Sequence, residues 1–128
     1  MVEGRLDLAV EAGGRLIGEV DARQPKNGLP PGVYEIGIGL FADGDKSKGL
    51  GREAFALLTD FLFQAHEAER VQASTWVENI AMRKVLERLG YTYEGIMRGF
   101  MPSQRGRDDY AMYGITRAER AAAKLNEH

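Results

Sequence analysis

Apolar and polar residues alternate over residues 6–11 and again over 16–20, and this two-residue period predicts two strands. Gly13 and Gly14 lie between these strands and supply the tight turn of a β-hairpin. The following stretch, residues 24–32, is rich in turn-forming residues and predicts a long hairpin loop. We therefore expect the chain to start almost directly in a sheet.

A third strand is predicted over residues 33–41. Its alternation places four apolar side chains on one face, those of Tyr34, Ile36, Ile38 and Leu40. The other face carries Glu35, Gly37 and Gly39. We expect the first face to be buried in the core and the second face to be bare.

An amphipathic helix follows and is predicted to end near residue 67. Its apolar positions have the spacing of one helix face: Leu50, Ala54, Leu57, Leu58, Phe61, Leu62 and Ala65. Residues 71–77 then predict another strand. Strand, helix and strand together form a crossover, which we expect to be right-handed.

A second helix is predicted to begin at Asn79 and to end before Gly90, where glycine is a favoured C-terminal cap. Its apolar stripe consists of Met82, Val85, Leu86 and Leu89. Two more strands are predicted over residues 91–101 and 108–116, joined by a loop over 102–107. A short exposed helix is predicted over the tail, residues 118–125.

The composition is that of an ordinary globular domain, with 128 residues, 44% hydrophobic residues, 28% charged residues and a formal net charge of −2. One domain of this length can bury its own core, and the near-neutral charge gives no general attraction to nucleic acid or an anionic membrane. The chain has no cysteine and two histidines, so we predict no disulfide, no cysteine acyl-enzyme and no metal. Because residues 1–10 contain no apolar signal segment, we expect a cytoplasmic protein.

The stretch between the third strand and the long helix predicts an anion-binding loop. The first N–H groups of a helix have no partner within the helix and lie at the positive end of its dipole. Gly49 and Gly51 let a ligand approach the main chain, and Lys46 and Lys48 add positive charge. The alternative is an ordinary helix start with turn-forming glycines and solvated lysines. The spacing fits neither a Walker loop nor a dinucleotide-binding fingerprint.

The pattern Lys46-x-x-Gly49-x-Gly51 resembles the pyrophosphate-binding signature of the GNAT superfamily of acyl-CoA-dependent N-acetyltransferases. In that signature the first position is usually Arg or Gln, so Lys46 is a mild departure.

Further stretches agree with this family in the correct order. Residues 34–40 are similar to its fourth strand, and residues 79–91 are similar to its later helix and turn. Residues 94–114 are similar to the branch that includes the ribosomal-protein N-terminal acetyltransferases. The resemblance covers about residues 15–117 and implies acetyl-CoA as the acyl donor.

The resemblance also carries roles to named residues. Glu35 falls on the position of the general base in some members, and the alternative is a solvated or ion-paired strand residue. The implied cofactor-binding residues are Ile38, Gly39, Leu40, Lys46, Lys48, Gly49, Leu50, Gly51, Arg52, Asn79 and Arg83. Asn79 is equally explained as a helix N-cap, and Arg83 as a solvated helix charge, so these alternatives stay open.

Two features depart from the family's pattern. The usual proton donors to the leaving thiolate are a Ser three positions after the asparagine or a Tyr seven positions after it, and here those positions are Met82 and Leu86. Neither side chain can donate a proton. In addition, we expect a single domain over residues 1–128 without the family's usual first strand and two helices, which help to line the acceptor pocket.

Together these features predict an α/β (α+β) domain of the GNAT arrangement, with a mixed, largely antiparallel sheet flanked by helices and one strand-helix-strand crossover. The expected activity is direct transfer of an acetyl group from acetyl-CoA to a protein N-terminus or a small amine. No nucleic acid or membrane partner is expected, and a homodimer is left open. One alternative is a non-catalytic acyl-CoA-binding or interaction module. Another is a generic nucleotide-phosphate binder.

Overall fold

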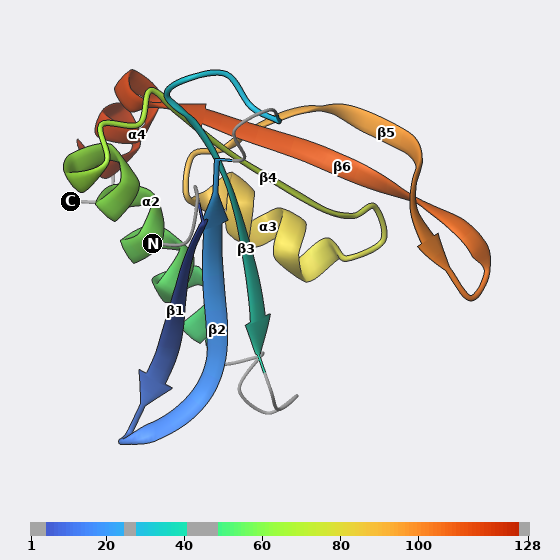
Figure 1. Ribbon diagram of the computed structural model, residues 1–128, viewed down its shortest axis with the longest axis horizontal. Coiled ribbons are helices and arrows are strands. Elements are labelled where there is room, and N and C mark those ends of the chain that lie inside the picture. The colour runs from blue at the N-terminus through green and yellow to red at the C-terminus, as the bar shows by residue number, and fades with distance from the viewer. Residues whose placement is uncertain (1–4, 25–27, 41–48, 126–128) are drawn as a thin grey trace. The chain divides into compact units, whose positions relative to one another are not determined.

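The structure is a computed structural model of the chain, and it describes residues 5–24, 28–40 and 49–125 (Figure 1). The described residues form six strands and three helices in the order β1 (Arg5–Ala12), β2 (Arg15–Arg23), β3 (Val33–Leu40), α2 (Leu50–Ala65), β4 (Arg70–Trp76), α3 (Ile80–Arg88), β5 (Thr92–Ser103), β6 (Gly106–Thr116) and α4 (Arg117–Leu125). The predicted α/β class and the predicted succession of strand, helix and strand are confirmed by β3, α2 and β4.

The chain divides into two compact units, Met1–Val71 and Gln72–His128. Strand β4 begins in the last residues of the first unit and continues into the second. That residues 1–128 form one domain stays a prediction.

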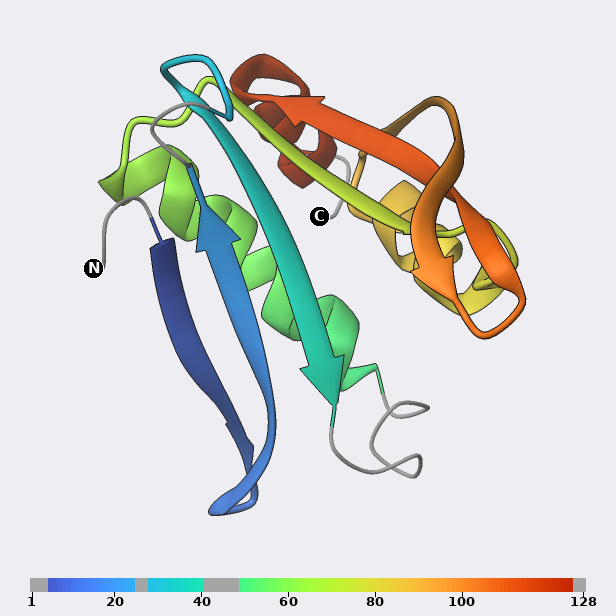
Figure 2. The same ribbon diagram turned by 45° about the vertical axis from the view of Figure 1, so that its right-hand side comes forward.

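The first unit contains an antiparallel sheet in the order β1-β2-β3, with α2 packed on one face of it (Figure 2). The predicted hairpin is confirmed, because β1 and β2 pair on either side of Gly13 and Gly14. Leu8 pairs with Val20, and Val20 pairs in turn with Ile38 on β3. This register places apolar positions of all three strands on the same side of the sheet.

The core of this unit lies between the sheet and α2. The strands contribute the buried side chains of Val20, Ala22, Tyr34 and Ile36, so the predicted core face of β3 is confirmed at Tyr34 and Ile36. The buried side chains of α2 are Phe55, Leu58, Thr59, Leu62 and Phe63.

The predicted apolar stripe of α2 is correct at Leu58 and Leu62 and wrong at three positions. Leu57 is 67% exposed, Phe61 is 40% exposed, and Ala65 is also exposed. Each helical residue turns the side chain by about 100°, so an arc centred on Leu58 and Leu62 leaves Leu57 at its margin. The spacing of apolar residues identified the helix, but the predicted buried arc extends too far toward Leu57 and Phe61.

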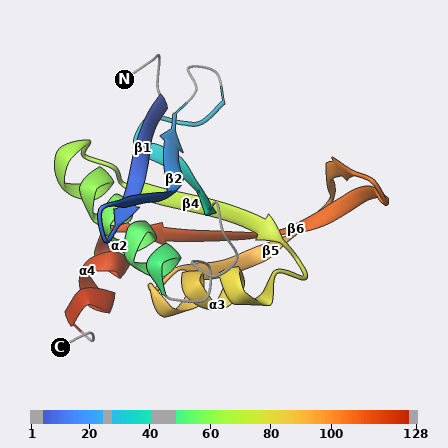
Figure 3. The ribbon, with the colours of Figure 1, turned by 90° about the horizontal axis from the view of Figure 1, so that it is seen from below.

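In the second unit β6 lies between β4 and β5, and β5 pairs with β6 in antiparallel fashion. Helices α3 and α4 lie beside these strands (Figure 3). The buried apolar side chains are Ala73, Leu86, Leu89, Tyr91, Ala111, Tyr113 and Ile115. Full burial of a single leucine or isoleucine contributes about 1.5–3 kcal/mol, so this small core depends on each of its members.

Helix α3 ends as its sequence predicts. Gly90 has φ +96°, a backbone conformation that suits glycine, and the Tyr91 N–H donates to the Leu86 carbonyl across the end of the helix. A Cβ at Gly90 would lie 2.7 Å from the Cβ of Ala123 in α4. Glycine therefore both terminates α3 and lets α4 pack against it.

Two predictions in the second unit need correction. The loop predicted over residues 102–107 is only a turn at residues 104 and 105, because Pro102 and Ser103 of β5 pair with Arg107 and Gly106 of β6. Within this turn Arg105 forms an ion pair with Asp108 at 2.9 Å and lies 4.3 Å above the Trp76 ring. Helix α4 is not simply exposed, since Arg120 is 4% exposed and donates to the Leu89 carbonyl at 3.1 Å.

Among the described residues, no helix is both long and apolar enough to cross a membrane.

Candidate functional site

The predicted site residues fall into two groups, one in each unit. The first unit holds the Glu35 face of β3 and the start of α2, and the second unit holds the start of α3. The Glu35 face is not bare as predicted, because Asp21 and Arg23 of β2 lie against it. Lys46 and Lys48 lie outside the described residues.

Glu35 is held by a cross-strand ion pair. It lies opposite Arg23 on β2, and the Arg23 Nη2 atom is 2.8 Å from the Glu35 Oε2 atom. The Glu35 side chain is 19% exposed and the Arg23 side chain is 50% exposed. An ion pair this accessible contributes about 0–1 kcal/mol to stability. The ion-paired alternative for Glu35 thus describes its geometry, while its role as a base stays a prediction.

A second carboxylate lies on the same face of the sheet. A Cβ added at Gly37 would lie 2.8 Å from the Asp21 Oδ1 atom, so glycine at this position leaves room for the carboxylate against β3. Asp21 pairs with Gly37 in the register and lies two residues from Arg23. The sequence analysis did not single out Asp21, although the alternation of β2 would have placed it on the face of Glu35.

The three β3 positions predicted to contact the cofactor through their backbone continue this ladder. Ile38, Gly39 and Leu40 lie opposite Val20, Glu19 and Gly18. Figures 1 and 2 show α2 beginning near the strand end at which Leu40 lies.

Helix α2 starts without a side-chain cap among the described residues. Gly49 is its N-cap, with φ +76° and ψ +5°, and no side chain accepts a hydrogen bond from the first turn. A Cβ at Gly49 would meet nothing within 4 Å, so the left-handed backbone rather than crowding favours glycine here. The N–H groups of Leu50, Gly51 and Arg52 therefore form a suitable cradle for an anion. Glu53 adds a negative charge to the same turn.

Helix α3 starts with a side-chain cap. The Asn79 Oδ1 atom accepts a hydrogen bond from the Met82 N–H at 3.1 Å, which confirms the N-cap alternative. Capping uses the amide oxygen, and the amide NH2 group is the part of Asn79 with which it would donate to a ligand. The two interpretations of Asn79 are therefore compatible.

Arg83 is half-buried and does not behave as a simple solvated charge. Its Nε donates to the Tyr113 hydroxyl at 2.9 Å, and its Nη1 donates to the Val77 carbonyl at 2.9 Å. The hydrogen bond to Tyr113 raises the pKa of Arg83 above its ordinary value. The Arg83 guanidinium also lies 5.4 Å from the centre of the Tyr93 ring.

Tyr113 is fully buried and joins Arg83 to a second residue of α3. Its hydroxyl donates to the Glu87 Oε2 atom at 3.0 Å. Burial raises the pKa of Tyr113 above 10.0, and the hydrogen bond to Glu87 acts in the same direction. Leu86 is also fully buried, in agreement with its predicted place in the apolar stripe.

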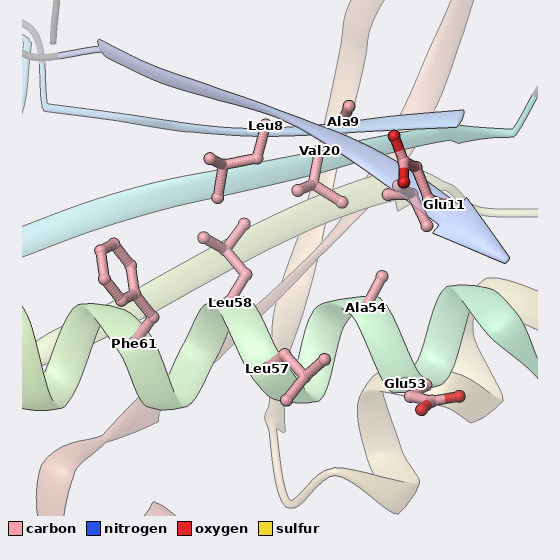
Figure 4. A pocket seen from close by; sticks show the side chains of 10 residues that line it. Leu8, Ala9, Glu11, Val20, Glu53, Ala54, Leu57, Leu58 and Phe61 are labelled. Atoms are coloured by element: carbon pink, nitrogen blue, oxygen red, sulfur yellow. The ribbon is translucent and has the colours of Figure 1, made fainter. Parts of the chain in front are cut away.

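An apolar hollow of about 650 Å³ lies between α2 and strands β1 and β2 in the first unit. Figure 4 shows Leu8 and Val20 pointing from the strands toward Leu58 of α2, with Glu11 and Glu53 at one end. None of the predicted site residues that the structure describes is among the residues that line it, although Glu53 of the first turn of α2 is.

No group of three or more His, Asp or Glu side chains within the described residues is arranged to hold a metal ion. That the protein uses no metal stays a prediction.

The arrangement of a glycine-led helix after a strand and an asparagine-capped helix after the next strand is what the GNAT resemblance implies. The sequence profile of the acetyltransferase (GNAT) domain matches residues 2–92, which is more than half of the chain. The chain therefore belongs to the GNAT acetyltransferase domain family, and the predicted family is confirmed.

Comparison with individual proteins agrees with this assignment. Over 85 residues the chain is 34% identical to the "Probable N-acetyltransferase YjcK" of Bacillus subtilis (strain 168), a match that covers 66% of this chain and 45% of that protein. The chain thus spans less than half the length of this curated relative.

Two solved structures show the same fold at lower identity. The first is RimL, the ribosomal L7/L12 alpha-N-protein acetyltransferase in complex with coenzyme A, with a TM-score of 0.78 and 17% identity over 88% of this chain and 62% of that chain. The second is a spermidine N-acetyltransferase SpeG chimera from Vibrio cholerae and hSSAT, with a TM-score of 0.83 and 19% identity over 94% of this chain and 74% of that chain. The predicted GNAT fold is confirmed by this likeness.

Proposed function

We propose that the chain acts as an N-acetyltransferase that transfers an acetyl group from acetyl-CoA to a primary amine. Membership of the GNAT family is the observation that carries the proposal. The start of α2 supports it, because no side chain of the described residues caps this glycine-led helix, and such a helix start suits the pyrophosphate of a CoA ester.

Each group of candidate residues has a place in this proposal. The main chain at Leu50, Gly51 and Arg52 would bind the pyrophosphate, with Lys46 and Lys48 adding positive charge. The β3 backbone at residues 38–40 would pair with the pantetheine arm. Asn79 would donate its amide NH2 group to the cofactor, and Arg83, in its predicted cofactor-binding role, would contact the phosphate end.

The chemistry requires one base. The amine nitrogen attacks the thioester carbonyl carbon, the N–C bond forms, the C–S bond breaks, and the amine proton passes to a base. Glu35 is the candidate base, because its carboxylate lies on the face of β3 that carries Gly37, away from the buried side chains of Tyr34 and Ile36. CoA leaves as a thiolate, which is a tolerable leaving group because a thiol has a pKa of about 8.5.

The acceptor is either a protein N-terminus or a small amine. RimL, whose substrate is a ribosomal protein, and the SpeG chimera, named for spermidine, share the fold of this chain. We further propose a cytoplasmic location, in which acetyl-CoA is at hand, and leave open a homodimer that completes the acceptor site.

A second candidate function is a non-catalytic acyl-CoA-binding module. The observation that favours it is the burial of Leu86 at the family's tyrosine position, where no proton donor is present. Loss of a general acid lowers a rate by about 10²- to 10⁴-fold, so it slows an enzyme without excluding turnover.

Turnover separates these functions. Purified chain is incubated with acetyl-CoA and a panel of N-terminal peptides and polyamines, and thiol release is measured. The expected result is acetylation by the wild-type chain and a fall in kcat of about 10²-fold or more in Glu35→Gln, with unchanged acetyl-CoA affinity. Glu69→Gln, an exposed glutamate of the same unit, is the matched control. An unchanged kcat in Glu35→Gln would remove Glu35 from the role of base. Acetyl-CoA binding with no turnover on any acceptor would favour the binding module.

A further inference from the structure

Three side chains link α3 to strand β6. The Tyr113 hydroxyl on β6 accepts a hydrogen bond from Arg83 at 2.9 Å and donates one to Glu87 at 3.0 Å. Arg83 and Glu87 are four residues apart and therefore lie on one side of α3. Tyr113 is fully buried while Arg83 is half-buried and Glu87 is exposed, so these hydrogen bonds tie a core residue to the surface of α3.

Arg83 also holds the segment that leads into α3. Its second donor binds the Val77 carbonyl at 2.9 Å, while the Val77 N–H donates to the Asp109 carbonyl of β6 at 3.0 Å. The segment before the helix is thus bonded on both sides of Val77. The next turn is closed by the Asn79 N–H, which donates to the Trp76 carbonyl at 2.8 Å.

These contacts determine where the Asn79 side chain lies. The Asn79 amide oxygen is already directed at the Met82 N–H by the cap. Asn79 is exposed, so its amide NH2 group lies at the surface end of a chain of contacts that begins at buried Tyr113. Two of the five N–H donors of Arg83, on Nε and Nη1, bind protein groups within this chain of contacts.

We infer that Arg83 and Tyr113 are positioning residues, which hold the start of α3 so that Asn79 presents its amide NH2 group to the CoA ester. This inference rests on the proposed function. It differs from the predicted role of Arg83, because the guanidinium acts on the cofactor through Val77 and Asn79 and not by contact with a phosphate.

The first test is a pair of calorimetric titrations with acetyl-CoA. Tyr113→Phe removes only the hydroxyl and should weaken binding about fivefold, the equivalent of about 1 kcal/mol at 1.4 kcal/mol per tenfold change. Tyr93→Phe is the matched control, because the Tyr93 ring lies 5.6 Å from the Tyr113 ring but is 46% exposed. The control should leave the affinity unchanged.

A double-mutant cycle separates positioning from general stability. Asn79→Ser keeps a capping oxygen and removes the amide NH2 group. If Tyr113 acts through Asn79, Tyr113→Phe should change the affinity by less than about twofold in the Asn79→Ser background. A fivefold loss in both backgrounds would mean that Tyr113 acts elsewhere and would overturn the inference.

Arg83 is tested with two ligands, acetyl-CoA and its 3′-dephospho form. Arg83→Gln should weaken the binding of both by the same factor, because the substitution displaces Asn79. A loss confined to the phosphorylated ligand would show direct phosphate contact and would overturn the positioning role. Arg83→Lys should recover little of the affinity that Arg83→Gln loses, since one ammonium group cannot reproduce the two directed hydrogen bonds of the guanidinium.

The outcomes distinguish this inference from the function on which it rests. If the folded wild-type chain does not bind acetyl-CoA, the proposed function fails and the inference fails with it. If the wild-type chain binds acetyl-CoA and Tyr113→Phe binds equally well, the inference alone is overturned.

Discussion

Helices α2 and α3 begin in opposite ways. Helix α2 starts at a glycine with a left-handed backbone, and no side chain of the described residues caps it. Helix α3 starts at an asparagine that caps its first turn, and a buried tyrosine and an arginine hold the segment before it.

The difference shows two ways in which a helix start can bind a ligand. An uncapped first turn leaves N–H donors for an anion and depends on the main chain alone. A capped first turn satisfies its own donors and can offer only a side-chain group, which must be held in place. In the proposed function the first start binds charge and the second orients a single amide.

The largest effect is expected when a negative charge is placed at the start of α2. Gly49→Asp should weaken acetyl-CoA binding by about tenfold or more, or about 1.4 kcal/mol, because a carboxylate both caps the first turn and repels a phosphate. The affinity is measured by calorimetric titration of the folded variant.

The matched control is Gly14→Asp in the hairpin turn. Gly14 has φ +75°, close to the +76° of Gly49, and a Cβ at either position meets nothing within 4 Å. Backbone strain and added charge are therefore the same in the two variants. Equal acetyl-CoA affinities in Gly49→Asp and Gly14→Asp would contradict the assignment of the α2 start.

A second prediction separates the two uses of Asn79. Asn79→Ala removes the cap and should lower the free energy of unfolding by about 1 kcal/mol, whereas Asn79→Ser keeps a capping oxygen and should cost little. Both variants lose the amide NH2 group and should bind acetyl-CoA more weakly to a similar extent. Urea unfolding and calorimetry on the same samples measure both effects. If only the alanine variant binds weakly, Asn79 acts as a cap alone.

The parts of the fold that local sequence signals describe were predicted correctly. Asn79 and Gly90 mark the two ends of α3, and the glycine pair at residues 13 and 14 marks the β1–β2 turn. Each of these signals depends on the backbone preference of one or two residues, which the sequence shows directly.

The errors arise where contacts between distant residues decide the structure. The loop predicted over residues 102–107 is shortened to a turn at residues 104 and 105, because the residues on either side pair across β5 and β6. Arg105 in this turn packs on Trp76 of β4, a contact with a distant residue that the local sequence does not show. Similarly, the exposure of Leu57 depends on which arc of α2 meets the sheet, and an apolar pattern with several adjacent members does not specify that arc.

The residues of the candidate site also differ in whether local sequence signals identify them. Gly49 and Asn79 could be found from sequence because glycine and asparagine have characteristic roles at helix starts. Tyr113 and Asp21 are not among the predicted site residues, because a tyrosine or an aspartate in a strand becomes informative only when its partner is known. Those partners, Arg83 and Gly37, are 30 and 16 residues away in the chain.

The smallest expected effect is on the pH dependence of the free energy of unfolding, through the Tyr113 hydroxyl that contacts α3. Burial raises the pKa of Tyr113 in the folded chain above its ordinary value of 10.0. The unfolded chain therefore loses this proton first as the pH rises, and the stabilisation present below pH 10.0 is lost as the pH approaches the folded pKa. The free energy of unfolding should fall more steeply above pH 10.0 in the wild-type chain than in Tyr113→Phe, by less than about 1.4 kcal/mol per pH unit. Urea unfolding at pH 8 and at pH 10.5 measures the difference, and Tyr93→Phe again serves as the control. Parallel slopes in the wild-type chain and Tyr113→Phe would mean that the hydroxyl is equally hydrated in both states, and the buried contact with Arg83 and Glu87 would then not hold α3 in solution.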